Sequence, residues 1–513
     1  MIAEPSPEHN LGPGCVFVCS CNPIQIKTEG LVKPQMRKSR LRERLATIVG
    51  DDRVSDLDYA RLAVSVESTA MGLSFLSPFS DEFTLPKIVV KPRTLQQIVE
   101  IVKLANETKT PLIIRGGGTG GSHGTISPHK GILVDMTDME DIIRIDEASM
   151  AVTVQPGVTW GKLRHELAKC GLRPGPLGPH GTWGATIGGA LSYDSCCVDS
   201  HRYGQLSEDL LNLQVVLPNG EVIETGSRTN SSSTIHHRYC NGPDLAGLFL
   251  GASGSLGIIT EATVRVYPKE EHTLHATFGF RHLDESCRVL HELSNLGYVN
   301  DLWMICGRHT VELAYPEHLE NTEAVLALYT TAHEKKSIEL IENKWYETAH
   351  KHQVKELDPE FAQKFASDYT GFETAVGQSL SWGVLTIWPI LRIPEIYVMA
   401  EKLLLKHEDI MLGEQGKKQW SVYASGGAKH PMTDLYFGFN ADRSDHEVRS
   451  NAFEALKEMQ KTAIANGAAP YDLGRLPGVD YLWENATSTY AFLKSLKKTL
   501  DPNNIMNPGS LML

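Results

Sequence analysis

The stretch Leu112-Ile-Ile-Arg-Gly-Gly-Gly-Thr-Gly-Gly-Ser122 joins a run of apolar, β-forming residues directly to a glycine-rich loop. Upstream, the pattern at 87–91 predicts a short strand, and Thr94 with Gln97 has the capping-box form that begins a helix. Consecutive glycines allow several backbone amides to converge on an anionic group. The sequence therefore predicts a strand, a helix and a second strand that ends in an anion-binding loop.

The position of this loop excludes the common dinucleotide-binding fingerprint, because that glycine pattern follows the first strand and begins the helix. A glycine-rich loop alone is also compatible with a simple turn. Two further segments, 179–189 and 251–260, are similarly rich in glycine and small residues. Three such segments in one domain favour an extended, narrow ligand such as a dinucleotide.

The flanking regions indicate an α+β protein with four parts. Residues 1–80 form an N-terminal arm with helices, and residues 81–269 alternate short strands, helices and the glycine-rich loops. Residues 270–480 contain longer helical stretches, including one that follows Ser444, where Ser444 and Glu447 have the capping-box form. Residues 481–513 form a C-terminal segment.

The bulk composition excludes several functional classes. The 513 residues carry a formal net charge of −13 at pH 7 and no long Lys/Arg run, which argues against a nucleic-acid partner. We find no secretory signal and no apolar stretch near the ~20 residues that span a bilayer, so we expect a cytoplasmic protein that is not integral to a membrane. The irregularly spaced cysteines are typical of a reducing compartment. Cys15, Cys19 and Cys21 are either an unliganded arm or part of an accessory metal or electron-relay site.

The motifs together resemble the vanillyl-alcohol-oxidase/para-cresol-methylhydroxylase (PCMH-type) flavoprotein superfamily, and within it the D-lactate dehydrogenase and glycolate oxidase flavoprotein-subunit branch. The residues that carry the resemblance are 115–121, 186–189, 203–204, 216–220, 254–260 and 500–509. The resemblance implies a PCMH-type two-subdomain FAD-binding domain over 81–269 and a second α+β substrate (cap) domain over 270–480. It also implies that 481–513 returns to the FAD domain.

In this superfamily the first glycine loop holds the FAD pyrophosphate, the second runs beside the isoalloxazine ring, and the third contacts the adenine side. The resemblance therefore assigns FAD binding to Arg115, Gly116, Gly117, Gly118, Thr119, Gly120, Gly121, Ser122, Pro179, Thr186, Gly188, Gly189, Ser192, Gly254 and Ile259. Arg115 either contacts the anion or braces the loop.

The resemblance also predicts that FAD is bound noncovalently. Relatives with a covalent flavin have His in the first loop, where this chain has Thr119, or Cys just before the second loop's glycines, where it has Ala185. Cys196 and Cys197 follow that loop and are interpreted as buried thiols, with a covalent link as the alternative.

On the substrate side the chain departs from the 2-hydroxyacid branch, which has a His-rich metal site. Only His430 stands near the expected strand, and Tyr471-Asp472-Leu473-Gly474-Arg475 replaces the expected Glu-His-Gly, so we predict no metal. The candidate catalytic residues are His430, Tyr436, Tyr471, Asp472 and Arg475. A surface His, core tyrosines and an Asp–Arg ion pair are the ordinary alternatives. Trp382, Trp388, Trp420, Phe437 and Phe439 either floor an aromatic pocket or belong to the core.

These observations predict an FAD-dependent dehydrogenase or oxidase. We expect it to remove a hydride from an alcohol, 2-hydroxyacid or phenolic-type C–H donor and to pass electrons to a separate acceptor. Two alternatives remain: a non-redox flavoenzyme resembling alkylglycerone-phosphate synthase, and a flavin-bearing subunit of an electron-transfer complex. The expected partners are a small-molecule substrate, an electron-transfer protein and further copies of the chain in a homo-oligomer.

Overall fold

The computed structural model describes residues 39–65, 85–120, 124–125, 129–179, 183–239, 241–314, 319–352, 354–365, 382–414, 417–442, 445–471 and 477–513. Several residues named in the predictions above lie outside these ranges. They are Cys15, Cys19, Cys21, Gly121, Ser122, Ser444 and the candidate catalytic residues Asp472 and Arg475.

The first sheet contains the strand that leads into the first glycine loop. Its order is β1-β2-β4-β3, and β4 pairs in parallel with both β2 and β3. Its strands are β1 (Val54–Ser55), β2 (Ile88–Val90), β3 (Leu112–Arg115) and β4 (Ile132–Asp135). Helix α3 (Leu95–Thr108) connects β2 to β3, and α1 (Arg40–Val49) and α2 (Asp58–Ala63) precede β2. The strand–helix–strand prediction is confirmed, and Thr94 caps α3 by accepting a hydrogen bond from the backbone N–H of Gln97.

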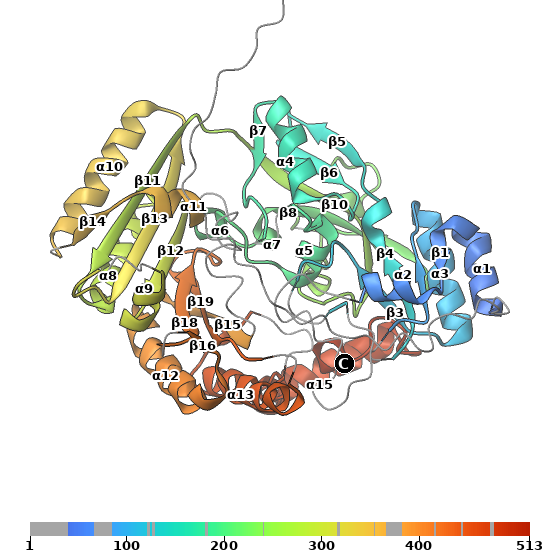
Figure 1. The fold of residues 1–513 in the computed structure, drawn as a ribbon. Coiled ribbons are helices and arrows are strands. Elements are labelled where there is room, and N and C mark those ends of the chain that lie inside the picture. The colour runs from blue at the N-terminus through green and yellow to red at the C-terminus, as the bar shows by residue number, and fades with distance from the viewer. Residues whose placement is uncertain are drawn as a thin grey trace, which may run out of the picture. The chain divides into compact units, whose positions relative to one another are not determined.

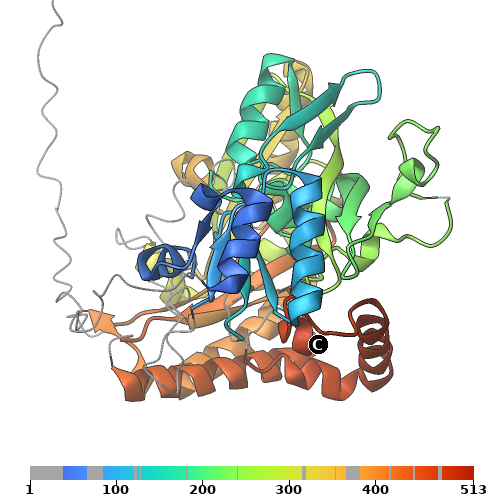
Figure 2. The ribbon, with the colours of Figure 1, turned by 90° about the vertical axis from the view of Figure 1, so that its right-hand side faces the viewer.

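The C-terminal segment lies beside the β3 edge of this first sheet (Figures 1 and 2). Met506 pairs in parallel with Leu112, whose N–H donates to Ile505 O over 2.7 Å. Lys497, in α15 (Thr487–Leu500), donates to the carbonyl oxygens of Ser255 and Met506 over 2.8 and 2.7 Å. The short helix α14 (Asp480–Asn485) precedes α15. The chain end therefore packs against the start of β3 and the third glycine-rich segment.

The second sheet is antiparallel and has the order β5-β6-β10-β8-β9, with β7 also paired to β10. Its strands are β5 (Ile142–Asp146), β6 (Ala151–Val154), β7 (Leu172–Pro174), β8 (Leu210–Val216), β9 (Val222–Glu224) and β10 (Ile258–Pro268). The connecting helices are α4 (Trp160–Lys169), α5 (Ile187–Tyr193), α6 (Ser200–Tyr203) and α7 (Leu206–Asp209). Pro218-Asn219-Gly220 is a sequence typical of a hairpin turn, and β8 and β9 form that hairpin, with Gly220 at a φ of 85° that disfavours other residues.

The third sheet is antiparallel and lies in the part of the chain that follows β10. Its order is β14-β11-β13-β12-β18-β19-β15-β20, with eight strands. They are β11 (His272–Phe280), β12 (Asp301–Cys306), β13 (Ala324–Ala332), β14 (Lys355–Leu357), β15 (Trp382–Pro389), β18 (Trp420–Ser425), β19 (Met432–Phe439) and β20 (Ala469–Pro470). A separate hairpin pairs β16 (Gly413–Glu414) with β17 (Lys417–Lys418).

Helices cover the outer face of the third sheet and bury its apolar side chains (Figure 1). They are α8 (Leu283–Asn295), α10 (Lys335–His350), α12 (Ile393–Lys406) and α13 (His446–Ala465). This core contains four of the five aromatic residues singled out in the sequence: Trp388, Trp420, Phe437 and Phe439. The fifth, Trp382, packs against it, so all five are core residues. The inner face carries Trp303, Tyr423 and Tyr436, with α9 (Arg308–Ala314) and α11 (Glu360–Phe365) packed on part of it.

The start of α13 corrects one local prediction. The residue that caps this helix is Asp445, whose carboxylate accepts hydrogen bonds from the N–H groups of Glu447 and Val448. The expected cap, Ser444, was therefore wrong by one residue. Asp and Ser are almost equally good caps, so the sequence pattern does not separate adjacent candidates.

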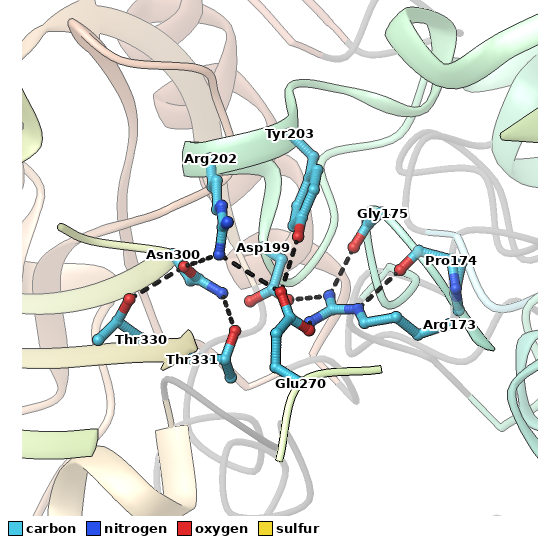
Figure 3. A network of polar contacts seen from close by, with 10 residues as sticks. All are labelled: Arg173, Pro174, Gly175, Asp199, Arg202, Tyr203, Glu270, Asn300, Thr330 and Thr331. Carbon is cyan, nitrogen blue, oxygen red and sulfur yellow. Dashed lines mark hydrogen bonds and ion pairs between the residues drawn. The ribbon is translucent and has the colours of Figure 1, made fainter. Parts of the chain in front are cut away.

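A buried ionic network lies where the chain passes from the second sheet to the third (Figure 3). Arg173 of β7 pairs with Asp199 and, over 3.2 Å, with Glu270. The side chains of these three residues are 8%, 0% and 4% exposed. Arg202 and Tyr203 of α6 also contact Glu270, and Arg202 donates to Asn300 beside β12. The network thus ties the second sheet to the third.

We expect Glu270→Gln to destabilise the protein in a pH-dependent way. Burial opposes ionisation of Glu270, but Arg173 and Arg202 outweigh burial and hold the pKa of this carboxyl below its ordinary value. A lowered pKa stabilises the fold above the unfolded value of about 4.3, and the stabilisation is lost as pH falls through the folded pKa. The substitution should therefore cost about 3 kcal/mol near neutral pH and progressively less below about pH 4.

Urea unfolding across that pH range measures the effect. The matched control is Glu271→Gln, since Glu271 is the exposed neighbour in sequence and should tolerate the change at every pH. An unchanged free energy of unfolding for Glu270→Gln near neutral pH would show that the ion pairs contribute no net stability.

Within the described ranges, no helix is both long enough and apolar enough to cross a membrane.

Candidate functional site

A cavity lies between the three glycine-rich segments and the inner face of the third sheet. Its empty volume, counted to the open mouth, is about 1570 Å³. The first two sheets and their loops line most of it, and Gly383, Leu385, Tyr436 and Tyr471 line the side of the third sheet. The lining residues come from segments that extend from β3 of the first sheet to β15 of the third.

The first glycine loop packs so closely that side chains are excluded from it. A Cβ on Gly116 would lie 2.2 Å from Thr186 Oγ1, and a Cβ on Gly117 would lie 1.8 Å from the carbonyl oxygen of Gly184. Gly118 has a φ of 69°, and a Cβ there would meet the guanidinium of Arg115 at 2.2 Å. The glycines therefore bring the first loop against the second and leave backbone at the cavity wall.

Arg115 braces this loop. Its Nη1 donates to Gly116 O over 3.1 Å and its Nη2 to Gly117 O over 3.4 Å. Arg115 does not line the cavity, whereas Gly116 through Gly120 do. Of the two roles that the sequence left open for Arg115, the geometry supports bracing.

The second and third segments complete the same wall. Thr186 caps α5 by accepting from the N–H of Gly189, and Pro179, Gly188 and Ser192 also line the cavity. In the third segment Gly254 has a φ of 70° and packs on Ile114, and Gly254 and Ile259 line the cavity. Asn507, from the C-terminal segment, donates through Nδ2 to the carbonyl oxygen of Ser253 over 2.6 Å.

The structure brings together most of the residues expected to bind FAD. Those that line the cavity are Gly116, Gly117, Gly118, Thr119, Gly120, Pro179, Thr186, Gly188, Gly189, Ser192, Gly254 and Ile259. A wall of backbone and small side chains is what an extended dinucleotide with a pyrophosphate needs, so the residues present fit FAD.

Tyr436 lines the cavity from β19 and is held flat against the third sheet. Cβ atoms on Gly383 and Gly438 would lie 2.2 and 2.5 Å from its hydroxyl oxygen, so these glycines make room for it. Its ring stacks on Tyr423 at 4.9 Å, and Tyr423 stacks on Trp303 at 4.7 Å. The phenol is therefore fixed from both sides.

Tyr471 lines the cavity beside Tyr436. Its hydroxyl accepts a hydrogen bond from the backbone N–H of Cys196 over 3.1 Å, and its own N–H donates to Leu385 O over 3.2 Å. The two contacts hold Tyr471 between the second glycine segment and β15.

His430 lies away from this cavity. Its Nε2 bonds Asn295 Oδ1 over 2.7 Å, and its ring contacts those of His201 and His291. His201 is buried, which lowers its pKa to about 3, so it is neutral and its Nδ1 donates to Ala428 O over 3.3 Å. The imidazole of His430 therefore belongs to a contact between α8 and the turn that precedes β19.

Several lining residues were not expected from the sequence. Tyr193, Gly383 and Leu385 are among them, and Cys196, named from the sequence only as an alternative covalent link, lines the cavity as well. Cys196 is buried, and burial raises its pKa well above the ordinary value, which disfavours a thiolate. Gly383 could have been found from the sequence, because a glycine inside an apolar strand often marks a site where a ligand or another backbone approaches closely.

Asp434 of β19 is a buried carboxylate near the site that does not line the cavity, and a carboxylate inside an apolar strand is recognisable in the sequence. It is 1% exposed, and Oδ1 accepts from the N–H and the hydroxyl of Ser425 over 2.8 and 2.7 Å. Oδ2 makes no hydrogen bond within the described ranges. Burial raises the pKa of Asp434 to about 6.

The chemistry of the lining is neutral in the part of the chain that the structure describes. None of the lining residues there carries a carboxylate, an imidazole, an amine or a guanidinium. No group of three or more His, Cys, Asp or Glu side chains in the same ranges could hold a metal ion. Hydroxyl groups from Tyr193, Tyr436, Tyr471 and small residues supply the polar contacts.

The fold and the cavity define a class of protein. The FAD binding domain family matches residues 86–226, and the C-terminal domain family of FAD linked oxidases matches residues 479–511. Residues 86–226 therefore form an FAD-binding domain, and the fold of the chain is that of PCMH-type FAD-binding proteins. The chain is an FAD-dependent dehydrogenase or oxidase.

Relatives with curated names lie in the branch that the sequence motifs indicated. The chain is 25% identical to D-lactate dehydrogenase [cytochrome], mitochondrial, of Arabidopsis thaliana, over 94% of this chain and 82% of the relative. It is 29% identical to glycolate oxidase subunit GlcD of Bacillus subtilis, over 49% of this chain and 50% of that subunit.

Solved structures share the fold at lower identity. A p-cresol methylhydroxylase with substrate bound has a TM-score of 0.74 at 17% identity, over 94% of this chain and 98% of that one. An alkyldihydroxyacetonephosphate synthase has a TM-score of 0.69 at 18% identity, over 94% and 87%. The predicted fold class, with a PCMH-type FAD-binding domain, is confirmed.

Proposed function

We propose that the chain oxidises an alcohol or 2-hydroxyacid whose carbon bears an apolar or aromatic group, and that it passes the electrons to a separate acceptor. FAD, when bound, supplies the capacity to accept a hydride from a C–H donor. The observation that carries the proposal is the neutral, partly aromatic wall that Leu385, Tyr436 and Tyr471 present on the side of the third sheet.

In this proposal the two tyrosines bind and orient the donor's hydroxyl. Both phenols are fixed by neighbours, Tyr436 by Tyr423 and two glycines and Tyr471 by Cys196 and Leu385. Fixed hydrogen-bonding groups hold the reacting bond in one orientation, which lowers the entropic part of the barrier. The apolar remainder of the wall favours a donor larger than lactate, while the named D-lactate dehydrogenase relative supports the hydroxyacid class.

We also propose that FAD is held without a covalent bond. Thr119 and Ala185 line the cavity where covalent relatives carry a linking residue. Cys196 lines the cavity as well but is a buried, protonated thiol, which is a poor nucleophile. The remaining predicted residues, Asp472 and Arg475, lie outside the described ranges, and their proposed contact with the donor stays a proposal.

The first test is an absorption spectrum before and after acid precipitation, followed by anaerobic mixing with a donor panel. The panel contains D-lactate, glycolate, longer and aromatic 2-hydroxyacids, and 4-hydroxybenzyl alcohol. Yellow colour released into the supernatant supports noncovalent FAD. Bleaching by an apolar or aromatic donor faster than by D-lactate supports the donor class, and bleaching by D-lactate or glycolate alone contradicts it.

The same experiment separates the non-redox alternative. A flavoenzyme that resembles alkylglycerone-phosphate synthase would keep its flavin oxidised with every alcohol in the panel. The structural likeness to such a synthase extends to the fold alone at 18% identity.

A further inference from the structure

An exposed apolar row follows the outer face of α12. Leu391, in the short 3₁₀ turn that leads into α12, is 53% exposed, Val398 is 63% exposed and Leu405 is 48% exposed. They follow one another at intervals of seven residues, so they lie on one side of the helix, about 10 Å apart. The opposite side of α12 is buried in the core of the third sheet, and Figure 1 shows the helix among those that cover the outer face of that sheet.

Charged residues alternate with this row on the same side. Glu395 lies between Leu391 and Val398, and Lys402 lies between Val398 and Leu405. Glu395 pairs with Arg392 over 3.0 Å in an exposed contact that contributes little stability. Lys402 makes no ion pair with any residue that the structure describes. The row therefore offers one negative and one positive group on either side of Val398.

This pattern is complementary to itself. We propose that α12 forms a homodimer contact in which two copies of the helix pack antiparallel about a two-fold axis at Val398. The axis places Leu391 of one copy against Leu405 of the other, because both lie seven residues from Val398. It also brings Glu395 of each copy beside Lys402 of the second copy, so that two ion pairs flank the apolar centre.

The charges select this register over its neighbour. An axis midway between Val398 and Leu405 would align these two apolar residues, whereas Leu412, which is 45% exposed and continues the spacing in the sequence, lies beyond the end of α12. That axis would bring Lys402 against Lys402 of the second copy and Glu395 towards Glu408 of the second copy. Like charges directly opposed are destabilising, which excludes the shifted arrangement.

Cysteine cross-linking tests the axis directly. Val398→Cys should form a disulfide between two copies under mild oxidation, because a residue on a two-fold axis faces itself. Leu391→Cys and Leu405→Cys should each cross-link weakly alone and strongly when the two variants are mixed. Leu340→Cys, on α10 and 60% exposed, is the matched control, with the unmodified chain as background for its own cysteines.

Exchanging the charges of Glu395 and Lys402 tests whether the partner is a second copy of the chain. By sedimentation velocity of the flavin-loaded full chain, Glu395→Lys and Lys402→Glu should each weaken the dimer at least tenfold, and the double variant should restore it. Retained flavin colour confirms that each variant is folded. A parent chain that is monomeric at micromolar concentration would overturn the proposal. A thiol of the Val398→Cys variant that is shielded from alkylation in a monomer would overturn it as well. A double variant that fails to regain the dimer would overturn the ion-pair register.

Discussion

Replacing Gly117 by alanine is expected to abolish FAD binding. The added Cβ would lie 1.8 Å from the carbonyl oxygen of Gly184, and a backbone atom cannot move aside as a flexible side chain can. The first and second glycine segments would therefore separate, and both line the cavity. We expect a colourless purified protein and a dissociation constant for added FAD raised at least about 100-fold, equivalent to about 3 kcal/mol.

A glycine outside the cavity offers a matched control. A Cβ on Gly279 of β11 would come no closer than 3.4 Å to its neighbours, an ordinary van der Waals contact, so Gly279→Ala should bind FAD nearly as well as the parent chain. Circular dichroism of both variants without FAD checks that each is folded. A yellow Gly117→Ala protein with the parent's affinity would show that the two segments do not need this close contact to hold the cofactor.

Removing the hydroxyls of Tyr436 and Tyr471 should slow the reduction of the flavin by the donor. Both groups line the cavity, and each is fixed by its neighbours before a donor binds. A hydrogen-bonding group fixed at the reacting centre typically contributes about 10²- to 10³-fold to the rate. We therefore expect Tyr436→Phe and Tyr471→Phe each to lower the anaerobic reduction rate by about 10²-fold or more, with FAD content unchanged.

His430 provides the comparison, because sequence reasoning placed it in the same catalytic set. It bonds Asn295 and lies outside the cavity, so His430→Gln should leave the rate within a few-fold of the parent chain. If His430→Gln instead lost the rate and both tyrosine variants kept it, the donor would have to bind elsewhere. Rates of the phenylalanine variants equal to the parent's would leave the tyrosines as packing residues.

The sequence predicted local structure where the residues that determine it lie close together in the chain. Thr94 with Gln97 begins α3, Gly220 turns a hairpin, and apolar runs form β3 and β10. These features depend on residues within a few positions of one another, so spacing and residue type suffice. The boundary at Ser444 failed only because two adjacent residues cap a helix almost equally well.

The sequence by itself determined the cofactor and its loops, because three glycine segments and the terminal motif are specific without knowledge of long-range contacts. Only the tertiary structure decided which residues face the cavity from the third sheet. Tyr436 lies over Gly383 because β15 pairs with β19, and Tyr471 meets Cys196 across 275 positions of sequence. Strand register and packing between distant segments set these neighbours, and a one-residue change of register would turn each side chain to the opposite face.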